Sequence, residues 1–180
     1  MFGKLRVTGK AQRGENRSGR QNHRAKGATA VYQRILVPVD GSVAAIQGLN
    51  EAIRLAKTLG SSIKVLHVVN ELILDAGFGT MQGQEQVIDA LRASGKKILS
   101  GAEHTVQVQK INCESQLVEV LGGRAADVIL DQAKSWHPDL IVMGTHGRRG
   151  LRRLAVGSDA ELVLRGTPVP VLLVRDVSAA

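Results

Sequence analysis

The segment formed by residues 139–174 constrains the fold more than any other part of the chain. It opens with an apolar run at 140–143, which suits a parallel strand that is buried on both faces. Glycines at 144, 147 and 150 follow, and they let the backbone turn sharply and approach a ligand closely. A second apolar run at 169–174 closes the segment. The order predicts strand, glycine-rich loop, helix and strand.

The start of the helix in this segment is marked by Ser158 and by Glu161 three positions later. This spacing fits a capping box, so we expect the helix to begin at Ser158. The N-terminus of a helix offers unpaired N–H groups and a positive dipole end, which suit phosphate. Four arginines nearby add positive charge: Arg148, Arg149, Arg152 and Arg153.

Two motifs together carry a family resemblance. The spacing Gly144-x2-Gly147-x9-Gly157-Ser158 resembles the ATP-binding signature of the universal stress protein family. Residues 35–42 read Ile-Leu-Val-Pro-Val-Asp-Gly-Ser and are similar to the opening strand and turn of that family. The resemblance covers residues 32–175, and it is specific because both motifs occur at matched positions. It implies a dimeric, ATP-binding domain with strand order 3-2-1-4-5.

The hydrophobic pattern along the chain predicts the same architecture. Strands are expected at 34–39, 63–69, 113–120, 140–143 and 169–174, and residues 70–83 are expected to form a loop. Helices are expected between Ser42 and Gly60, around 87–106, around 126–133 and from Ser158 to Gly166. Each crossover is long enough for parallel pairing, which predicts a doubly wound α/β sheet of five strands with helices on both faces.

Fold and motifs then point to one place. If the strand order is the one that the resemblance implies, the first and fourth strands adjoin where the winding reverses. Ligands of doubly wound sheets bind beyond the carboxyl ends of the strands at this reversal. Asp40 follows the first strand and Gly144 ends the fourth. We therefore expect both motifs to face one crevice.

The ligand that the resemblance implies is ATP, with or without Mg²⁺, or AMP. Backbone N–H groups of the motif glycines and Ser158 would bind the phosphates, which Arg148 could also reach. Asp40 would hold the ribose hydroxyls or the adenine edge, with Pro38 and Val39 packed beside the base and the Val68 backbone at the adenine. The full set of expected ligand-binding residues is Pro38, Val39, Asp40, Val68, Met143, Gly144, His146, Gly147, Arg148, Gly157, Ser158 and Asp159.

One residue of this set departs from the family pattern. Asp159 stands where the family more often has a small or β-branched residue. A carboxylate in the first turn of a helix interacts favourably with the helix dipole. Close to a triphosphate it would repel, unless it points away or shares Mg²⁺.

Other nucleotide and catalytic motifs are missing from the sequence. There is no Gly-x4-Gly-Lys-Ser/Thr loop and no dinucleotide-binding glycine fingerprint. There is also no zinc-ligand spacing, and His146 has no identifiable partner that would orient it as a base. Three functions stay open: an ATP-dependent switch or scaffold in the stress response with little or no hydrolysis, a nucleotide-free dimeric interaction protein, and a slow ATPase.

The net charge of +8 is concentrated at the N-terminus. Residues 1–30 contain eight basic residues and one acidic residue, so we expect a disordered extension before a domain at 31–176 and a short tail at 177–180. The extension is either an arm that contacts nucleic-acid phosphates or sequence without a function of its own. We favour the second alternative because the extension has hardly any aromatic residues for base stacking.

Location and assembly are predicted from the remaining features. A single cysteine, Cys113, fits a reducing compartment, and no secretory signal or membrane-spanning run is present, so we expect a cytoplasmic protein. Pro170 argues that the last strand lies at the edge of the sheet. An apolar edge favours pairing with another chain. A homodimer through this strand is the prediction, and the family resemblance implies the same.

Overall fold

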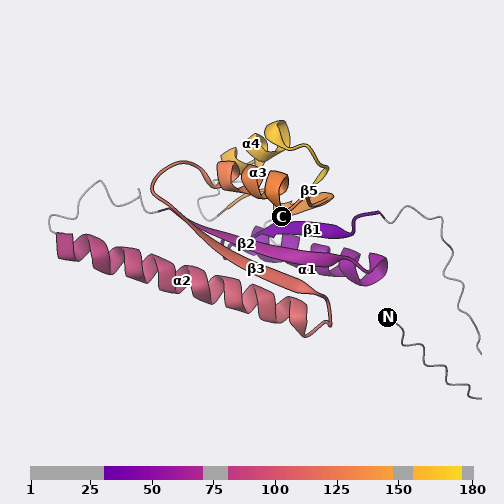
Figure 1. Cartoon of the computed structure of the whole chain (residues 1–180), viewed down its shortest axis with the longest axis horizontal. Coiled ribbons are helices and arrows are strands. Elements are labelled where there is room, and N and C mark those ends of the chain that lie inside the picture. Colours follow the sequence, from indigo (N-terminus) through magenta and orange to yellow (C-terminus); the bar gives the residue numbers. More distant parts are fainter. Residues whose placement is uncertain (1–30, 71–80, 148–155, 176–180) are drawn as a thin grey trace, which may run out of the picture.

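The computed structural model describes residues 31–70, 81–147 and 156–175. In these residues five parallel strands form one sheet in the order β3-β2-β1-β4-β5, which confirms the predicted fold (Figure 1). The strands are β1 Arg34–Pro38, β2 Ser62–Asn70, β3 Cys113–Val120, β4 Leu140–Gly144 and β5 Val171–Val174. The helices are α1 Val43–Leu59, α2 Met81–Gln107, α3 Ala125–Ser135 and α4 Ser158–Gly166. The extension at 1–30 and the tail at 177–180 lie outside the described residues.

The central strand β1 ends at Pro38, one residue earlier than predicted. The Val39 N–H still donates to the Leu66 carbonyl of β2 at 2.8 Å, so the neighbouring Pro38 nitrogen points to the β4 side. On that side β1 pairs with β4 at Ile35 and Leu36, before Pro38 is reached. A proline is tolerated here because the ladder has ended at the position where its missing N–H would have donated.

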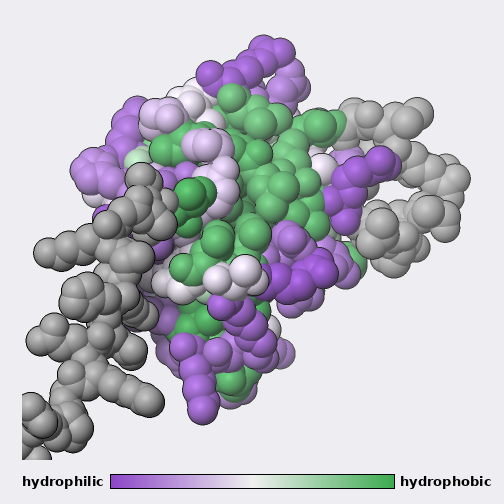
Figure 2. Space-filling model, turned by 90° about the vertical axis from the view of Figure 1, so that its right-hand side faces the viewer, coloured by the Kyte–Doolittle hydropathy of each residue, from purple (hydrophilic) through white to green (hydrophobic). Residues whose placement is uncertain are grey.

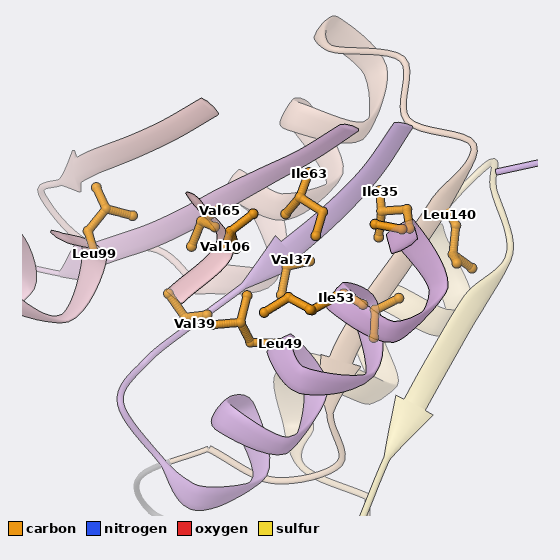
Figure 3. Close-up of a cluster of buried hydrophobic side chains, with 13 residues drawn as sticks. Ile35, Val37, Val39, Leu49, Ile53, Ile63, Val65, Leu99, Val106 and Leu140 are labelled. Atoms are coloured by element: carbon orange, nitrogen blue, oxygen red, sulfur yellow. The ribbon is translucent and has the colours of Figure 1, made fainter. Parts of the chain in front are cut away.

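One face of the sheet is covered by α1 and α2. Figure 3 shows side chains of α1, such as Leu49 and Ile53, in one cluster with strand residues such as Val37 and Val65. The Ser42 Oγ caps α1 by accepting the Ala45 N–H at 3.2 Å, and Gly60, with φ of 74°, ends it as predicted. These contacts fix the start of α1 close to the end of β1.

The opposite face is covered by α3 and α4. Trp136 packs on this face at the end where the strands begin. Trp136 is buried, and its Nε1–H donates to Glu114 Oε2 at 3.1 Å. The Arg34 guanidinium lies 4.3 Å from the centre of the indole ring. Lys64 lies against the same ring and donates to Gln132 Oε1 at 2.9 Å. Burial lowers the pKa of Lys64, while the nearby Glu114 opposes this shift and Arg34 adds to it.

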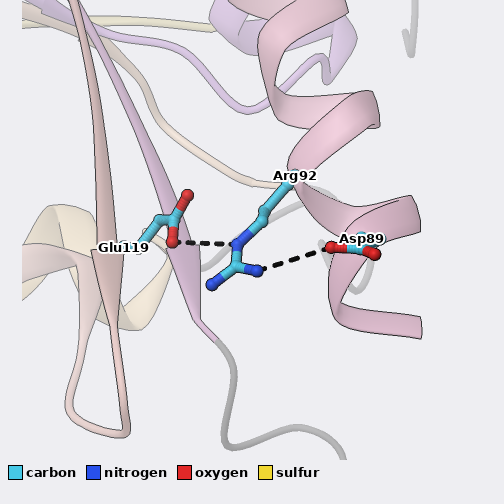
Figure 4. A network of polar contacts seen from close by, with 3 residues as sticks. All are labelled: Asp89, Arg92 and Glu119. Carbon is cyan, nitrogen blue, oxygen red and sulfur yellow. Dashed lines mark hydrogen bonds and ion pairs between the residues drawn. The ribbon is translucent and has the colours of Figure 1, made fainter. Parts of the chain in front are cut away.

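The long helix α2 begins at Met81, so the loop predicted for 70–83 is wrong at both ends, where Asn70 belongs to β2 and residues 81–83 are helical. Residues 71–80 lie outside the described residues. Arg92 ties α2 to the sheet by donating from Nε to Glu119 Oε2 of β3 at 2.9 Å (Figure 4). Both side chains are more than a third exposed, so the pair contributes little to the free energy of unfolding.

The end of the molecule at which the strands begin carries hydrophobic residues in a central band with hydrophilic residues around it (Figure 2). A polar hollow of about 570 Å³ lies at this end, between the starts of β1 and β2, the last turn of α1 and the connection from α2 to β3. It is lined by Arg34, Lys57 and Ser61, among others, and by none of the predicted ligand-binding residues. The two motifs lie at the opposite end, where the strands finish.

Candidate functional site

The candidate site lies where β1 and β4, neighbours in the sheet, both end. Asp40 follows β1 by two residues, and the glycine-rich loop begins at Gly144, the last residue of β4. The start of α4 meets the same loop through a hydrogen bond from the Gly157 N–H to the Thr145 carbonyl at 2.8 Å. Three segments that are distant in sequence therefore meet at one edge of the sheet.

Asp40 and Gly147 form the closest contact between the two motifs. A Cβ atom added to Gly147 would lie 2.8 Å from Asp40 Oδ2, closer than real Cβ atoms approach an oxygen. The other carboxylate oxygen, Oδ1, accepts the Ser42 N–H at 2.9 Å. The Ser42 hydroxyl lies 3.5 Å from the His146 carbonyl. Glycine at 147 thus lets the loop backbone lie against a carboxylate that the start of α1 holds in place.

Gly144 has a different neighbour from the one that a ligand role predicts. A Cβ atom at this position would lie 2.6 Å from the backbone carbon of Ala44. The residue is buried, and its φ is not positive. Packing of α1 against the end of β4 therefore explains this glycine by itself, whether or not its N–H faces a phosphate.

The helix α4 begins at Ser158, as predicted, but the predicted capping box is wrong. Gly157 occupies the N-cap position, and no side chain caps the helix. The Gly157 carbonyl accepts the Glu161 N–H at 2.9 Å, which makes Ser158 the first helical residue. Because the Gly157 N–H already donates to Thr145, it is not directed at a ligand in this structure. The exposed Ser158 remains at the helix N-terminus, where anions are favoured.

Asp159 is directed at a neighbouring helix. Its Oδ1 accepts the Ala126 N–H at 3.3 Å, in the first turn of α3. The first N–H groups of a helix have no intrahelical acceptor, and a carboxylate there also interacts favourably with the dipole. The residue that departs from the family pattern therefore has a structural partner. Its Oδ1 is bonded to α3 and not to the glycine-rich loop.

His146 and Thr145 form a pair inside the loop. The Thr145 Oγ1 lies 2.9 Å from His146 Nδ1, a hydrogen-bonding distance. The other ring nitrogen of His146, Nε2, is buried and has no hydrogen-bond partner among the described residues. Buried polar atoms are nearly always bonded, so this nitrogen holds hydrogen-bonding capacity that the described part of the protein does not use.

The other predicted residues lie at the same end of the sheet. Val39 and Met143 are buried, and Pro38 and Val68 are half-buried. Pro38 is in register with Leu66, which places Val68 two residues further toward the carboxyl end of β2. Arg148 and the arginines after it lie outside the described residues.

Sequence reasoning missed three contributors to this site. Thr145 is buried and anchors both His146 and α4, and Ala44 fixes how closely α1 approaches Gly144. His67 is buried, and its Nδ1–H donates to the Val39 carbonyl at 2.7 Å. Position was the available signal, because Thr145 lies between the motif glycines and Ala44 lies two residues after the helix cap Ser42.

Metal ligands and reactive thiols are sparse in the described part of the chain. No group of three or more His, Cys, Asp or Glu side chains is placed to hold a metal ion there. Burial raises the pKa of the Cys113 thiol to about 11, helped by the charges of Glu103 and Glu114. Across the same residues, no helix has the length and apolarity that a membrane crossing requires.

Comparison with known proteins places this fold and site in a family. Residues 31–175 match the universal stress protein family. Universal stress protein MJ0531 of Methanocaldococcus jannaschii is 29% identical over 145 residues, 81% of this chain and 83% of that protein. The structure of universal stress protein UspA from Lactobacillus plantarum is 29% identical, with a TM-score of 0.69 over 81% of this chain and 99% of that one.

A further relative was solved with a ligand. The universal stress protein from Archaeoglobus fulgidus in complex with dAMP is 28% identical to this chain, with a TM-score of 0.55. The comparison covers 80% of this chain and 98% of the other. With the family match over residues 31–175, these similarities establish that the chain belongs to the universal stress protein family.

Proposed function

We propose that this protein binds an adenine nucleotide, ATP or AMP, in the crevice between the carboxyl ends of β1 and β4. The observation that carries the proposal is the contact of Gly147 with Asp40, because it joins the two sequence motifs at the reversal of the sheet. Ligands of doubly wound sheets bind at this point. Asp40 is the candidate partner of the ribose hydroxyls, and the start of α4 at Ser158 is the candidate phosphate site.

A relative with the same fold and a bound nucleotide supports this proposal. The Archaeoglobus fulgidus protein, 28% identical to this chain, was solved with dAMP. Binding of dAMP needs an adenine site and one phosphate site, which Val39, Asp40 and the α4 N-terminus would provide in this chain. The proposal includes ATP, with or without Mg²⁺, because the positive end of α4 favours further phosphates.

Regulation of other molecules, with little or no hydrolysis, is the role that we propose for the bound state. A nucleotide that bridges Asp40, the loop at Gly147 and α4 would order three segments at once. Ligand binding to the native state shifts conformational populations only by the difference in affinity between states. The protein would therefore act as a nucleotide-dependent switch or scaffold in the cytoplasm, and phosphate release faster than in a Gly147→Ala variant would instead identify a slow ATPase.

The test is the thermal stability of the full chain with ATP or AMP, with and without Mg²⁺. A ligand at a hundred times its Kd stabilises the native state by about 2.7 kcal/mol, which gives a clear rise in Tm. Gly147→Ala should reduce this rise, because the new methyl group displaces the Asp40 carboxylate at modest cost to the fold. Gly101→Ala is the matched control, since an added Cβ has no neighbour within 4 Å there.

Two results would contradict the proposal. An unchanged Tm with both nucleotides at millimolar concentration would favour the nucleotide-free interaction protein. An equal rise in wild type and Gly147→Ala would show that nucleotide binds elsewhere.

We also propose that β5 forms a homodimer. The strand lies at the edge of the sheet, as predicted, and its four apolar residues are only half-buried. The carbonyls of Pro170 and Val174 accept bonds on the β4 side, so Val171 and Leu173 direct their backbone groups to the open edge. Sedimentation should give a dimer, and Leu173→Pro, which removes an outward N–H, should give a monomer. A wild-type monomer at micromolar concentration would contradict this.

A further inference from the structure

An open apolar groove lies between α1 and α2, on the face of the sheet covered by these helices. Its volume is about 380 Å³, within the roughly 300–1,000 Å³ typical of small-molecule sites. Residues from both helices form its walls: Ile46 and Leu49 from α1, and Ile98, Gly101 and Ala102 from α2. The groove reaches Val39, which also belongs to the candidate nucleotide site, but Asp40 and the glycines at 144, 147 and 157 do not line it.

The apolar surface of this groove is accessible to solvent. Ile46 is 51% exposed, and Ile98 across the groove is half-buried. Leu49, deeper in the groove, is 4% exposed and belongs to the core. Exposed isoleucine in a concave surface is unfavourable in water and favours an apolar occupant.

Gly101 keeps the groove open. It lies inside α2, where glycine is less favourable than alanine by about 1 kcal/mol. Its φ is not positive, and an added Cβ would meet no atom within 4 Å. Neither backbone conformation nor packing therefore requires glycine here. The consequence of the missing side chain is space in the groove wall.

Lys97 supplies the single charged side chain among the residues that line the groove. It is exposed, and it forms no ion pair with a carboxylate in the described part of the chain. Asn50 adds a polar side chain on the opposite helix. A cation at the edge of an apolar groove is complementary to an amphipathic anion, with the charge at the rim and the apolar part inside.

The length of the groove limits its occupant. Lys97 and Thr105 line its two ends along α2 and are eight residues apart, which is about 12 Å at 1.5 Å per residue. A three-turn helix of a partner protein needs about 16 Å and is itself about 10 Å wide. We infer that this groove binds a small monocarboxylate with an unbranched apolar tail, its carboxylate at Lys97 and its tail between Ile46 and Ile98.

The experiment is isothermal titration of the full chain with octanoate. Saturable binding of one octanoate per chain is expected, and excess ATP should leave its affinity unchanged. Gly101→Leu should weaken binding by at least about tenfold, because its side chain occupies space that is now open in the groove wall. Lys97→Gln should weaken it by up to about fivefold, the range of an exposed ion pair, and 1-octanol should show the same loss with wild type.

Controls separate binding from folding. Gly101→Ala keeps most of the space and should bind octanoate with wild-type affinity. If Gly101→Leu lowers the Tm, Ile46→Glu is the second blocking variant, because it places a negative charge at an exposed rim position. Octanoate binding that survives both blocking variants, that ATP competes away, or that is undetectable in wild type would overturn the inference.

Discussion

The candidate nucleotide site at the ends of β1 and β4 and the groove between α1 and α2 both contain glycines, and these glycines have opposite surroundings. At the crevice, added Cβ atoms would lie 2.6 Å from Ala44 at position 144 and 2.8 Å from Asp40 at position 147. At the groove, an added Cβ at Gly101 would meet nothing within 4 Å. At positions 144 and 147, the missing side chain lets neighbouring groups approach the backbone closely. At position 101, the missing side chain leaves open space.

The same contrast occurs within a single helix. Gly95 of α2 packs against the sheet, where an added Cβ would lie 2.8 Å from His67 Cδ2 and 2.9 Å from Val69 Cγ2. Gly101, six residues later, has open space. Both glycines reduce helix propensity equally, so only their neighbours distinguish a residue required for packing from one that leaves a cavity.

The largest expected effect is that of Gly144→Val. The new side chain would overlap the Ala44 backbone, which cannot move without shifting α1, so we expect a loss of about 3 kcal/mol or more in the free energy of unfolding. Urea denaturation followed by circular dichroism measures this loss. Gly101→Val carries the same change into open space and should stay within about 0.5 kcal/mol of wild type. A Gly144→Val protein as stable as wild type would show that α1 adjusts freely.

The next effect compares Gly95→Ala with Gly101→Ala in the same denaturation experiment. The first should destabilise by about 1–2 kcal/mol, because the methyl group crowds three side chains of the sheet and offsets the gain in helix propensity. The second should stabilise by about 0.5–1 kcal/mol, because only the gain applies. Equal changes at both positions would contradict the contrast between packed and open glycines.

Much of this fold could be predicted because its signals are local. The hydrophobic pattern predicted all five strands, Pro170 predicted the edge strand, and the two motifs predicted that Asp40 and Gly144 lie at one end of the sheet. The sequence does not show why a glycine is needed at each motif position. A glycine spacing is the same whether the residue faces a ligand, as predicted for Gly144, or packs against Ala44, and the difference is set by a helix that is distant in sequence.

The hydrogen-bond partners of individual residues could not be predicted from the sequence either. Ser158 and Glu161 have capping-box spacing, yet Gly157 occupies the cap, because its N–H is held by the Thr145 carbonyl of the preceding loop. Nothing in the local sequence shows a partner for His67, but its ring donates to the Val39 carbonyl at the end of β1 and is buried. In each case a tertiary hydrogen bond decides what the local pattern leaves open.

The smallest expected effect concerns Asp159, whose contact lies behind the crevice. Asp159→Ala removes the acceptor of the Ala126 N–H at the start of α3 and should cost about 0.5–1 kcal/mol of unfolding free energy. Asp159→Asn keeps an acceptor oxygen and should cost less. If the carboxylate serves α3, neither variant should weaken the stabilisation by ATP, measured as the rise in Tm. A larger rise in both variants would instead show that the Asp159 charge repels the bound phosphates and that its bond to α3 does not hold it away from them.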